Sequence, residues 1–180
     1  ATWLRHYAGL TGNILGQNAS GAVSGGGNSL HAYTMRQPVG VAGLILPWNG
    51  PIGSFIIKVA PALAAGNSVV LKPAEGASLT LLRLAEICAE AGLPEGVLNV
   101  VTGRGAVTGE AIGLHRDIDV LAFTGSGTVG RRLMEYSARS NLKRVYLELG
   151  GKSPNIVFAD APELDRVAKV SVNGIFRNSG

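Results

Sequence analysis

The chain has 180 residues, of which 46% are hydrophobic and 16% are charged, and its formal net charge at pH 7 is +4. This balance suits a packed core and excludes a disordered chain, and the scattered basic residues form no nucleic-acid-binding patch. Prolines and Lys58 interrupt the longest apolar run, so no stretch reaches the roughly 18 apolar residues of a membrane span. We therefore expect a cytoplasmic protein that binds neither nucleic acid nor a membrane.

The first 37 residues differ in composition and hydrophobic pattern from the rest of the chain. Residues 1–10, ATWLRHYAGL, have a helical pattern, and residues 11–37 are rich in Gly, Ser and Asn with alternating pieces such as LHAYTMRQ. Short alternating segments between glycines are typical of a β-ribbon. We predict an N-terminal helix and β-ribbon segment at residues 1–37.

From residue 38 onward, apolar runs alternate with helical patterns. The expected strands cover residues 39–47, 68–75, 96–103 and 120–126, and the expected helices cover 52–67, 78–94, 106–115 and 127–140. This alternation predicts an α/β fold with a doubly wound parallel sheet, which is a Rossmann-like cofactor domain, at residues 38–143. Ser78 is the expected N-cap of the clearest helix.

Polar residues follow three of these strands, in the segments PWNG, KPAE and TGSG. The carboxyl ends of parallel strands form the ligand-binding edge of such a sheet. Residues 125–130, GSGTVG, match the pattern G-x-G-x-x-G between a strand and a helix, where free N–H groups suit a pyrophosphate. Glycines at a tight turn also occur without a ligand, and the usual fingerprint follows the first strand, so the motif alone leaves both interpretations open.

Two acids compete for the role of binding the cofactor ribose. Glu148 lies roughly 20 residues beyond the glycines, where the ordinary fingerprint places an acid. Glu75 directly follows the second strand, three residues after Lys72, which is the better analogue of the ribose-binding position. A solvated ion pair is the alternative for Lys72 and Glu75. If Glu75 binds the ribose, Glu148 is available for chemistry.

Four motifs carry a family resemblance. PWN at 47–49, LKPAE at 71–75, AFTGS at 122–126 and LELGGKSP at 147–154 resemble, in order and approximate spacing, motifs of the aldehyde dehydrogenase superfamily. The resemblance implies an NAD(P)-dependent enzyme, a homodimer or homotetramer, that oxidises an aldehyde to a carboxylic acid through a cysteine thioester. The expected cofactor is NAD, with NADP as the alternative.

The resemblance also implies roles for individual residues. The amide of Asn49 stabilises the oxyanion, and Glu148 activates the water that hydrolyses the thioester. Its neighbours Leu147 and Leu149 are expected to give Glu148 an apolar environment. The residues expected to bind the cofactor are Trp48, Lys72, Glu75, Gly125, Ser126, Val129, Gly130 and Leu149. Gly127 and Thr128 depart from the acidic or small residues that the family often has in this turn.

The nucleophile of such an enzyme is missing from the sequence. Cys88, the single cysteine, lies on the apolar stripe of helix 78–94 and is predicted to be a buried structural thiol. By the resemblance, the catalytic cysteine follows an N-x-G-Q stretch, and the chain stops at NSG, residues 178–180. We therefore expect a fragment that is inactive alone, with residues 144–180 as the start of a catalytic domain. The three histidines form no ligand cluster, so no metal site is predicted.

Two functions from other classes are alternatives. One is a nucleotide-binding homologue without catalysis, and the other is an oligomerisation module that assembles through residues 20–37. Among enzymes, an acyl-CoA-forming reductase is the nearest rival. Such a reductase does not need Glu148 as a hydrolytic base, so the presence of Glu148 favours acid formation.

Overall fold

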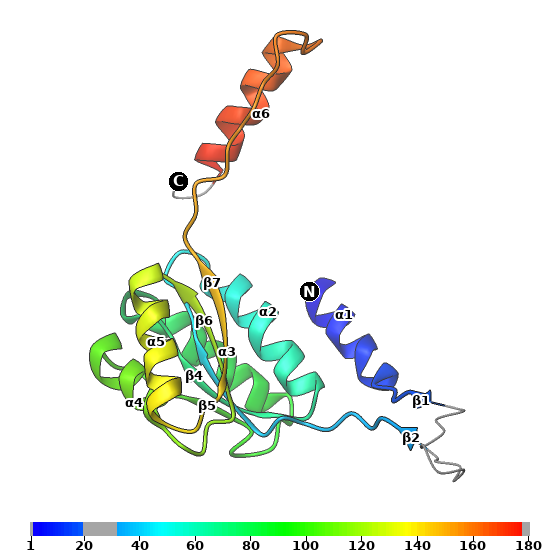
Figure 1. The fold of residues 1–180 in the computed structure, drawn as a ribbon, viewed down its shortest axis with the longest axis vertical. Coiled ribbons are helices and arrows are strands. Elements are labelled where there is room, and N and C mark those ends of the chain that lie inside the picture. The colour runs from blue at the N-terminus through cyan, green and yellow to red at the C-terminus, as the bar shows by residue number, and fades with distance from the viewer. Residues whose placement is uncertain (1, 20–31, 178–180) are drawn as a thin grey trace, which may run out of the picture. The chain divides into compact units, whose positions relative to one another are not determined.

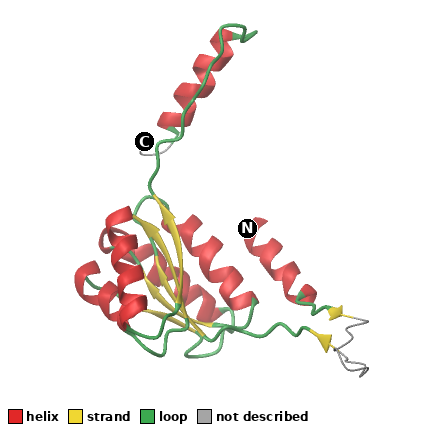
Figure 2. Cartoon of the chain, in the orientation of Figure 1, coloured by secondary structure: helices red, strands yellow, loops and turns green. Residues whose placement is uncertain are grey.

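A computed structural model of the chain describes residues 2–19 and 32–177. They belong to two compact units, Ala1–Leu149 and Gly150–Gly180, drawn by secondary structure in Figure 2. The sequence predicted domain boundaries after residues 37 and 143, which separate segments of different proposed function. These boundaries remain predictions. No helix within the described ranges combines the length and apolarity that crossing a membrane requires.

The first unit begins with a helix and a two-stranded ribbon. Helix α1 spans Thr2–Leu10 and runs into the 3-10 turn η1, Thr11–Asn13. Strands β1, Asn18–Ala19, and β2, Ala32–Tyr33, pair antiparallel. The predicted β-ribbon is therefore confirmed at its base, and residues 20–31 of the prediction lie outside the described residues.

The centre of the first unit is a parallel sheet in the order β5-β4-β3-β6-β7. The strands are β3, Val41–Ile45; β4, Ser68–Lys72; β5, Leu98–Val100; β6, Val120–Gly125; and β7, Arg144–Leu149. The sequence predicted four strands for this sheet. The fifth is β7, which pairs in parallel with β6 along its whole length.

Helices cover both faces of this sheet, which confirms the doubly wound α/β fold. On one face, α2, Pro51–Ala64, and α3, Ser78–Glu90, contribute Phe55 and Leu81 to a core that includes Leu71 of β4. On the other, α4, Glu110–Leu114, and α5, Gly127–Arg139, contribute Ile112 and Leu133. A π-helical turn, η3, at Gly105–Gly109 leads into α4. Figure 1 shows α2 to the right of the sheet and α4 and α5 to the left.

The start of α3 differs from the prediction. A 3-10 turn, η2, at Glu75–Ala77 precedes the helix, so Ala77 and not Ser78 is the N-cap residue. The Ser78 hydroxyl instead donates back to the carbonyl oxygens of Ala74, at 3.2 Å, and Glu75, at 3.3 Å. The prediction was wrong because the turn after β4 already winds the chain in the helical sense before Ser78.

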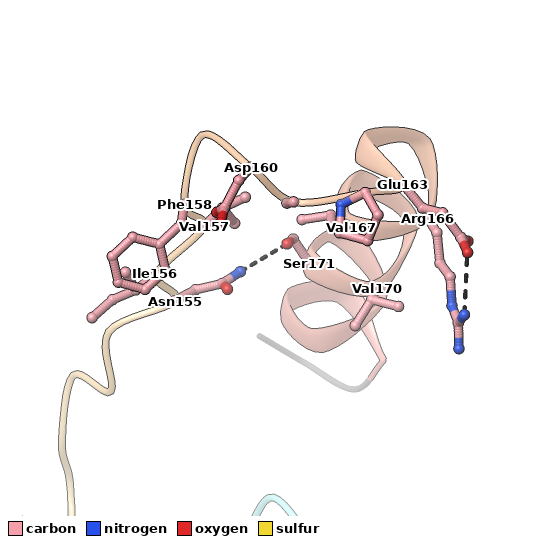
Figure 3. A pocket seen from close by; sticks show the side chains of 12 residues that line it. Asn155, Ile156, Val157, Phe158, Asp160, Glu163, Arg166, Val167, Val170 and Ser171 are labelled. Atoms are coloured by element: carbon pink, nitrogen blue, oxygen red, sulfur yellow. Dashed lines mark hydrogen bonds and ion pairs between the residues drawn. The ribbon is translucent and has the colours of Figure 1, made fainter.

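The second unit consists of an extended segment and helix α6, Leu164–Phe176. The Asn155 amide donates to the Ser171 hydroxyl at 2.8 Å and holds the segment against the helix (Figure 3). A pocket between segment and helix is lined by Ile156, Phe158 and Val170. None of the residues of α6 is buried.

Candidate active site

The strand ends that carry the predicted site residues share one edge of the sheet. In the strand register, Lys72 pairs with Ile45, Ile45 with Phe123, and Phe123 with Leu147. The loops that follow these residues therefore leave the sheet at neighbouring positions. The strand order reverses between β3 and β6, and a crevice at such a switch point is where ligands bind in open α/β sheets.

Lys72 ends the interior strand β4 and is only 3% exposed. Its ammonium group donates to the carbonyl oxygen of Pro73 at 3.0 Å. Desolvation by burial lowers the pKa of Lys72, and the nearby Glu75 carboxylate opposes that shift. The alternative of a solvated ion pair does not describe Lys72, because its side chain is buried.

Glu75 lies at the start of the turn after β4, and its side chain is exposed. One carboxylate oxygen, Oε1, accepts a hydrogen bond from the backbone N–H of Gly105 at 2.8 Å. Sequence reasoning missed Gly105, because nothing local in VTGRG links it to a residue 30 positions earlier. The carboxylate is thus exposed for a ligand and attached to the neighbouring loop.

The GSGTVG motif forms the start of α5. Ser126 is the N-cap residue, and its Oγ accepts from the Val129 N–H at 3.3 Å. The hydroxyl hydrogen can still be donated, and helix geometry gives the N–H groups of Gly127 and Thr128 no acceptor inside the helix. These donors at one helix end are suited to an anionic group such as a pyrophosphate.

The flanking glycines of this motif are required by packing. A Cβ at Gly125 would overlap the Phe123 ring, and a Cβ at Gly130 would lie 2.9 Å from Leu149 Cδ2. Gly130 is buried, so its missing side chain allows α5 to approach β7 closely. This is the helix–strand packing role of the third fingerprint glycine.

Trp48 and Asn49 occupy the loop between β3 and α2, directly before the α2 N-cap residue Gly50. Both side chains are exposed, and Trp48 is 66% exposed. The Trp48 ring is therefore not part of the core. The position of the loop puts both residues at the switch point.

Glu148 lies on β7, which is an edge strand among the described residues, and its side chain is exposed. The expected apolar environment is therefore wrong for this chain, because the strand has a neighbour on one side only. The half-buried Lys58 of α2 lies near it. Desolvation lowers the pKa of Lys58, and the Glu148 carboxylate opposes that shift. Sequence reasoning missed Lys58, although a single charge in the apolar helix PIGSFIIKVAPALA was an available signal.

The remaining candidate groups do not add to the site. Cys88 of α3 is half-buried, so the prediction of a fully buried thiol was wrong, although its side chain does pack against the core. Desolvation by this burial raises the pKa of its thiol, which disfavours the nucleophilic thiolate. In the part of the chain that the structure describes, no three or more His, Cys, Asp or Glu residues are grouped as metal ligands.

A family model described as Aldehyde dehydrogenase family matches residues 1–180. The chain belongs to the aldehyde dehydrogenase family. Family membership confirms the resemblance that the four motifs gave. It also accounts for the sheet order, since the solved aldehyde dehydrogenase KauB from Pseudomonas aeruginosa has a TM-score of 0.90 to the chain at 46% identity, covering 97% of this chain and 34% of that one.

Three similar proteins illustrate the relationship. The chain is 49% identical over 179 residues to the NADP/NAD-dependent aldehyde dehydrogenase PuuC of Escherichia coli (strain K12), covering 98% of this chain and 35% of that protein. It is 49% identical over 177 residues to aldehyde dehydrogenase, cytosolic 1 of Mus musculus, covering 98% and 34%. The crystal structure of PnpE in complex with nicotinamide adenine dinucleotide has a TM-score of 0.88 at 43% identity, covering 96% and 34%. This family segment thus spans about a third of the length of these relatives.

Proposed function

We propose that the whole protein, meaning a polypeptide of the length of these relatives, oxidises an aldehyde to a carboxylic acid with NAD(P)+ through a cysteine thioester. The observation that carries the proposal is the shared sheet edge, where Asn49, Glu75 and Ser126 follow strands and Glu148 lies near the end of one, with the strands in continuous register. Family membership supports it, because these four residues occupy the motifs by which the chain resembles the family.

The dinucleotide fits the groups at this edge. The exposed Glu75 carboxylate can accept hydrogen bonds from ribose hydroxyls, and the buried Lys72 adds positive charge beneath it. The Ser126 hydroxyl and the first N–H groups of α5 can donate to the pyrophosphate. Bound NAD(P)+ supplies the hydride acceptor of the oxidation. The relative PuuC is named for both cofactors, and the solved PnpE holds nicotinamide adenine dinucleotide.

Five further residues shape the cofactor cleft. Trp48 and Val129 present exposed apolar surface at the switch point, 66% and 39% exposed. Gly125 and Gly130 act through packing, and Leu149, which lies against Gly130, fixes the distance between α5 and β7. We assign cofactor binding to residues 38–143 and the start of the catalytic domain to residues 144–180.

The catalytic roles fall to Asn49 and Glu148. A cysteine thiolate from another part of the whole protein adds to the aldehyde carbon, and the Asn49 amide donates a hydrogen bond to the resulting oxyanion. Loss of hydride leaves a thioester. Glu148 then takes a proton from water as the water oxygen attacks the thioester carbonyl, and the carbon–sulfur bond breaks to release the acid and the thiol.

We also propose that the whole protein is a cytoplasmic homodimer or homotetramer. The mouse relative is named as cytosolic, which supports the location. The ribbon of β1 and β2 supports the assembly, because Met35 beside it is 68% exposed. Light scattering after size-exclusion chromatography tests this, and Met35→Glu is expected to lower the measured mass of the assembly.

The test of the proposed function is an assay of the whole protein with NAD+ and a panel of aliphatic and aromatic aldehydes. We expect absorbance of the reduced nicotinamide to rise together with an equimolar carboxylic acid, measured by chromatography, for at least one class of aldehyde. Formation of an acyl-CoA only when coenzyme A is added would identify the reductase alternative. Cofactor binding without turnover of any aldehyde would identify the non-catalytic homologue.

A further inference from the structure

The contact between Glu75 and the backbone of Gly105 joins two loops at the cofactor edge. The Gly105 N–H donates to Oε1 of Glu75 at 2.8 Å, across 30 residues of sequence. Glu75 is otherwise exposed, and an exposed glutamate samples several rotamers that must be given up when it binds a ligand. The hydrogen bond restricts this freedom before any ligand arrives. It uses one carboxylate oxygen, so the other, Oε2, is available for a ligand.

The local backbone explains why the Gly105 N–H points away from its own helix. Gly103 has a φ of 143°, a region that favours glycine, and a Cβ there would overlap the Thr108 side chain. Arg104 then takes an extended conformation, with φ −66° and ψ 140°, directly before η3. The first N–H of a helix has no acceptor inside it, so the Gly105 N–H is available to Glu75.

We propose that the backbone N–H of Gly105 is a positioning group that sets the preference for NAD over NADP by fixing the Glu75 carboxylate. The inference rests on the proposed function, in which Glu75 accepts hydrogen bonds from the adenosine ribose. A fixed carboxylate meets the two ribose hydroxyls without ordering cost. It also repels a 2′-phosphate, because it cannot rotate away. A released carboxylate loses both effects, so NAD binds less tightly and NADP is less strongly excluded.

The structure offers variants that remove this one donor. Gly105→Pro deletes the N–H, and proline suits the first position of a helix after the extended Arg104. Gly105→Ala retains the N–H, and its Cβ has no atom within 4 Å.

The measurement is calorimetric titration of the 180-residue chain with NAD+ and, separately, with NADP+, at one ionic strength. We expect Gly105→Pro to weaken NAD+ binding about five- to tenfold, the order of ordering one glutamate side chain. NADP+ binding should change by less than about twofold, so the ratio of the two dissociation constants falls. Gly105→Ala should keep the original ratio. Glu75→Ala should abolish the effect of Gly105→Pro in the double variant.

Circular dichroism of each variant shows whether the fold is retained. If Gly105→Pro unfolds the chain, replacement of Gly105 by glycolic acid removes the same N–H as a backbone ester, and the same fall in the ratio is expected. An unchanged ratio in the folded N–H-deleted protein would overturn the inference and leave the proposed function standing. Failure of the original chain to bind either dinucleotide would overturn the cofactor assignment, and the inference with it.

Discussion

The carboxyl ends of β4 and β7 each carry a glutamate of the candidate site, but the two side chains are held differently. Glu75 follows an interior strand and accepts a hydrogen bond from the loop after β5. Glu148 lies on an edge strand and is exposed, with the half-buried Lys58 as a charged neighbour. An interior strand end receives contacts from loops on both sides, whereas an edge strand end receives them from one side.

This difference divides the proposed function between two regions. The end of β4, with Lys72 buried and Glu75 tethered, is ordered by contacts within the described residues. For the end of β7 we expect further residues of the whole protein to complete the surroundings of Glu148. Cofactor recognition should therefore respond to changes at β4, and catalysis to changes at β7 and at Asn49.

The largest effect is expected from Glu148→Gln in the whole protein. Loss of a general base typically lowers a rate by about 10² to 10⁴, and we expect this loss in steady-state turnover alone. Stopped-flow absorbance should still show a first burst of reduced nicotinamide, because hydride loss precedes hydrolysis. Disappearance of the burst together with turnover would remove Glu148 from the hydrolytic step.

Asn49→Ala should slow the first part of the reaction, in which the thiolate adds to the aldehyde and hydride leaves. Removal of one oxyanion donor typically costs about 10² to 10³ in rate, so the burst itself should slow by that factor. The dissociation constant for NAD+ should stay within about twofold, since Asn49 is assigned to the substrate oxygen. A burst of unchanged rate would mean that PWN is only a turn between β3 and α2.

Gly130→Val tests whether β7 is held in place by α5. The added side chain would press on Leu149 Cδ2, 2.9 Å from the new Cβ, and on Leu147. Overpacking of this kind lowers the free energy of unfolding by about 1–3 kcal/mol, measurable by urea denaturation of the chain. Gly53→Val is the matched control, because its Cβ has no atom within 4 Å, and its effect should be within about 0.5 kcal/mol. Equal losses at both positions would show that Gly130 is not at a close contact.

The smallest effect is expected from Lys58→Met, and it depends on pH. Desolvation places the pKa of Lys58 in the folded chain below its ordinary value. Between these two pKa values the folded chain binds fewer protons than the unfolded chain, so stability from this group rises with pH. The free energy of unfolding of the original chain, relative to Lys58→Met, should therefore increase as pH approaches the ordinary lysine pKa. A difference that falls over this range would mean that pairing with Glu148 outweighs desolvation.

The fold could be predicted largely from the sequence because buried parallel strands are continuous apolar runs separated by helical patterns. The predicted strand VGVAGLILP and the predicted helix SLTLLRLAEICAEAGLP are both found, with ends that differ by a few residues. The position of β7 in the sheet was not predicted, because RVYLEL contains no information about which strand it pairs with. The N-cap of α3 was misplaced because the turn at Glu75–Ala77 has no distinct sequence pattern.

The candidate site was only partly predictable, because sequence patterns describe local structure and do not show contacts between distant residues. Motifs located Asn49, Glu75, Ser126 and Glu148, since each lies directly after an apolar strand or within one. Gly105 and Lys58 act through contacts with residues far away in the sequence. Periodicity and capping rules describe neighbours within a few residues, so neither contact had a local signal that named its partner.

The central claim is that the end of β4, and not the end of β7, determines which dinucleotide the chain recognises. Titration of the 180-residue chain, Glu75→Gln and Glu148→Gln with NAD+ and NADP+ at fixed ionic strength tests it most directly. We expect the original chain to prefer NAD+, and Glu75→Gln to narrow that preference about three- to tenfold, the order of one charge interaction near a protein surface. Glu148→Gln should leave the preference unchanged. A chain that prefers NADP+, or a preference that moves with Glu148 and not with Glu75, would contradict the claim.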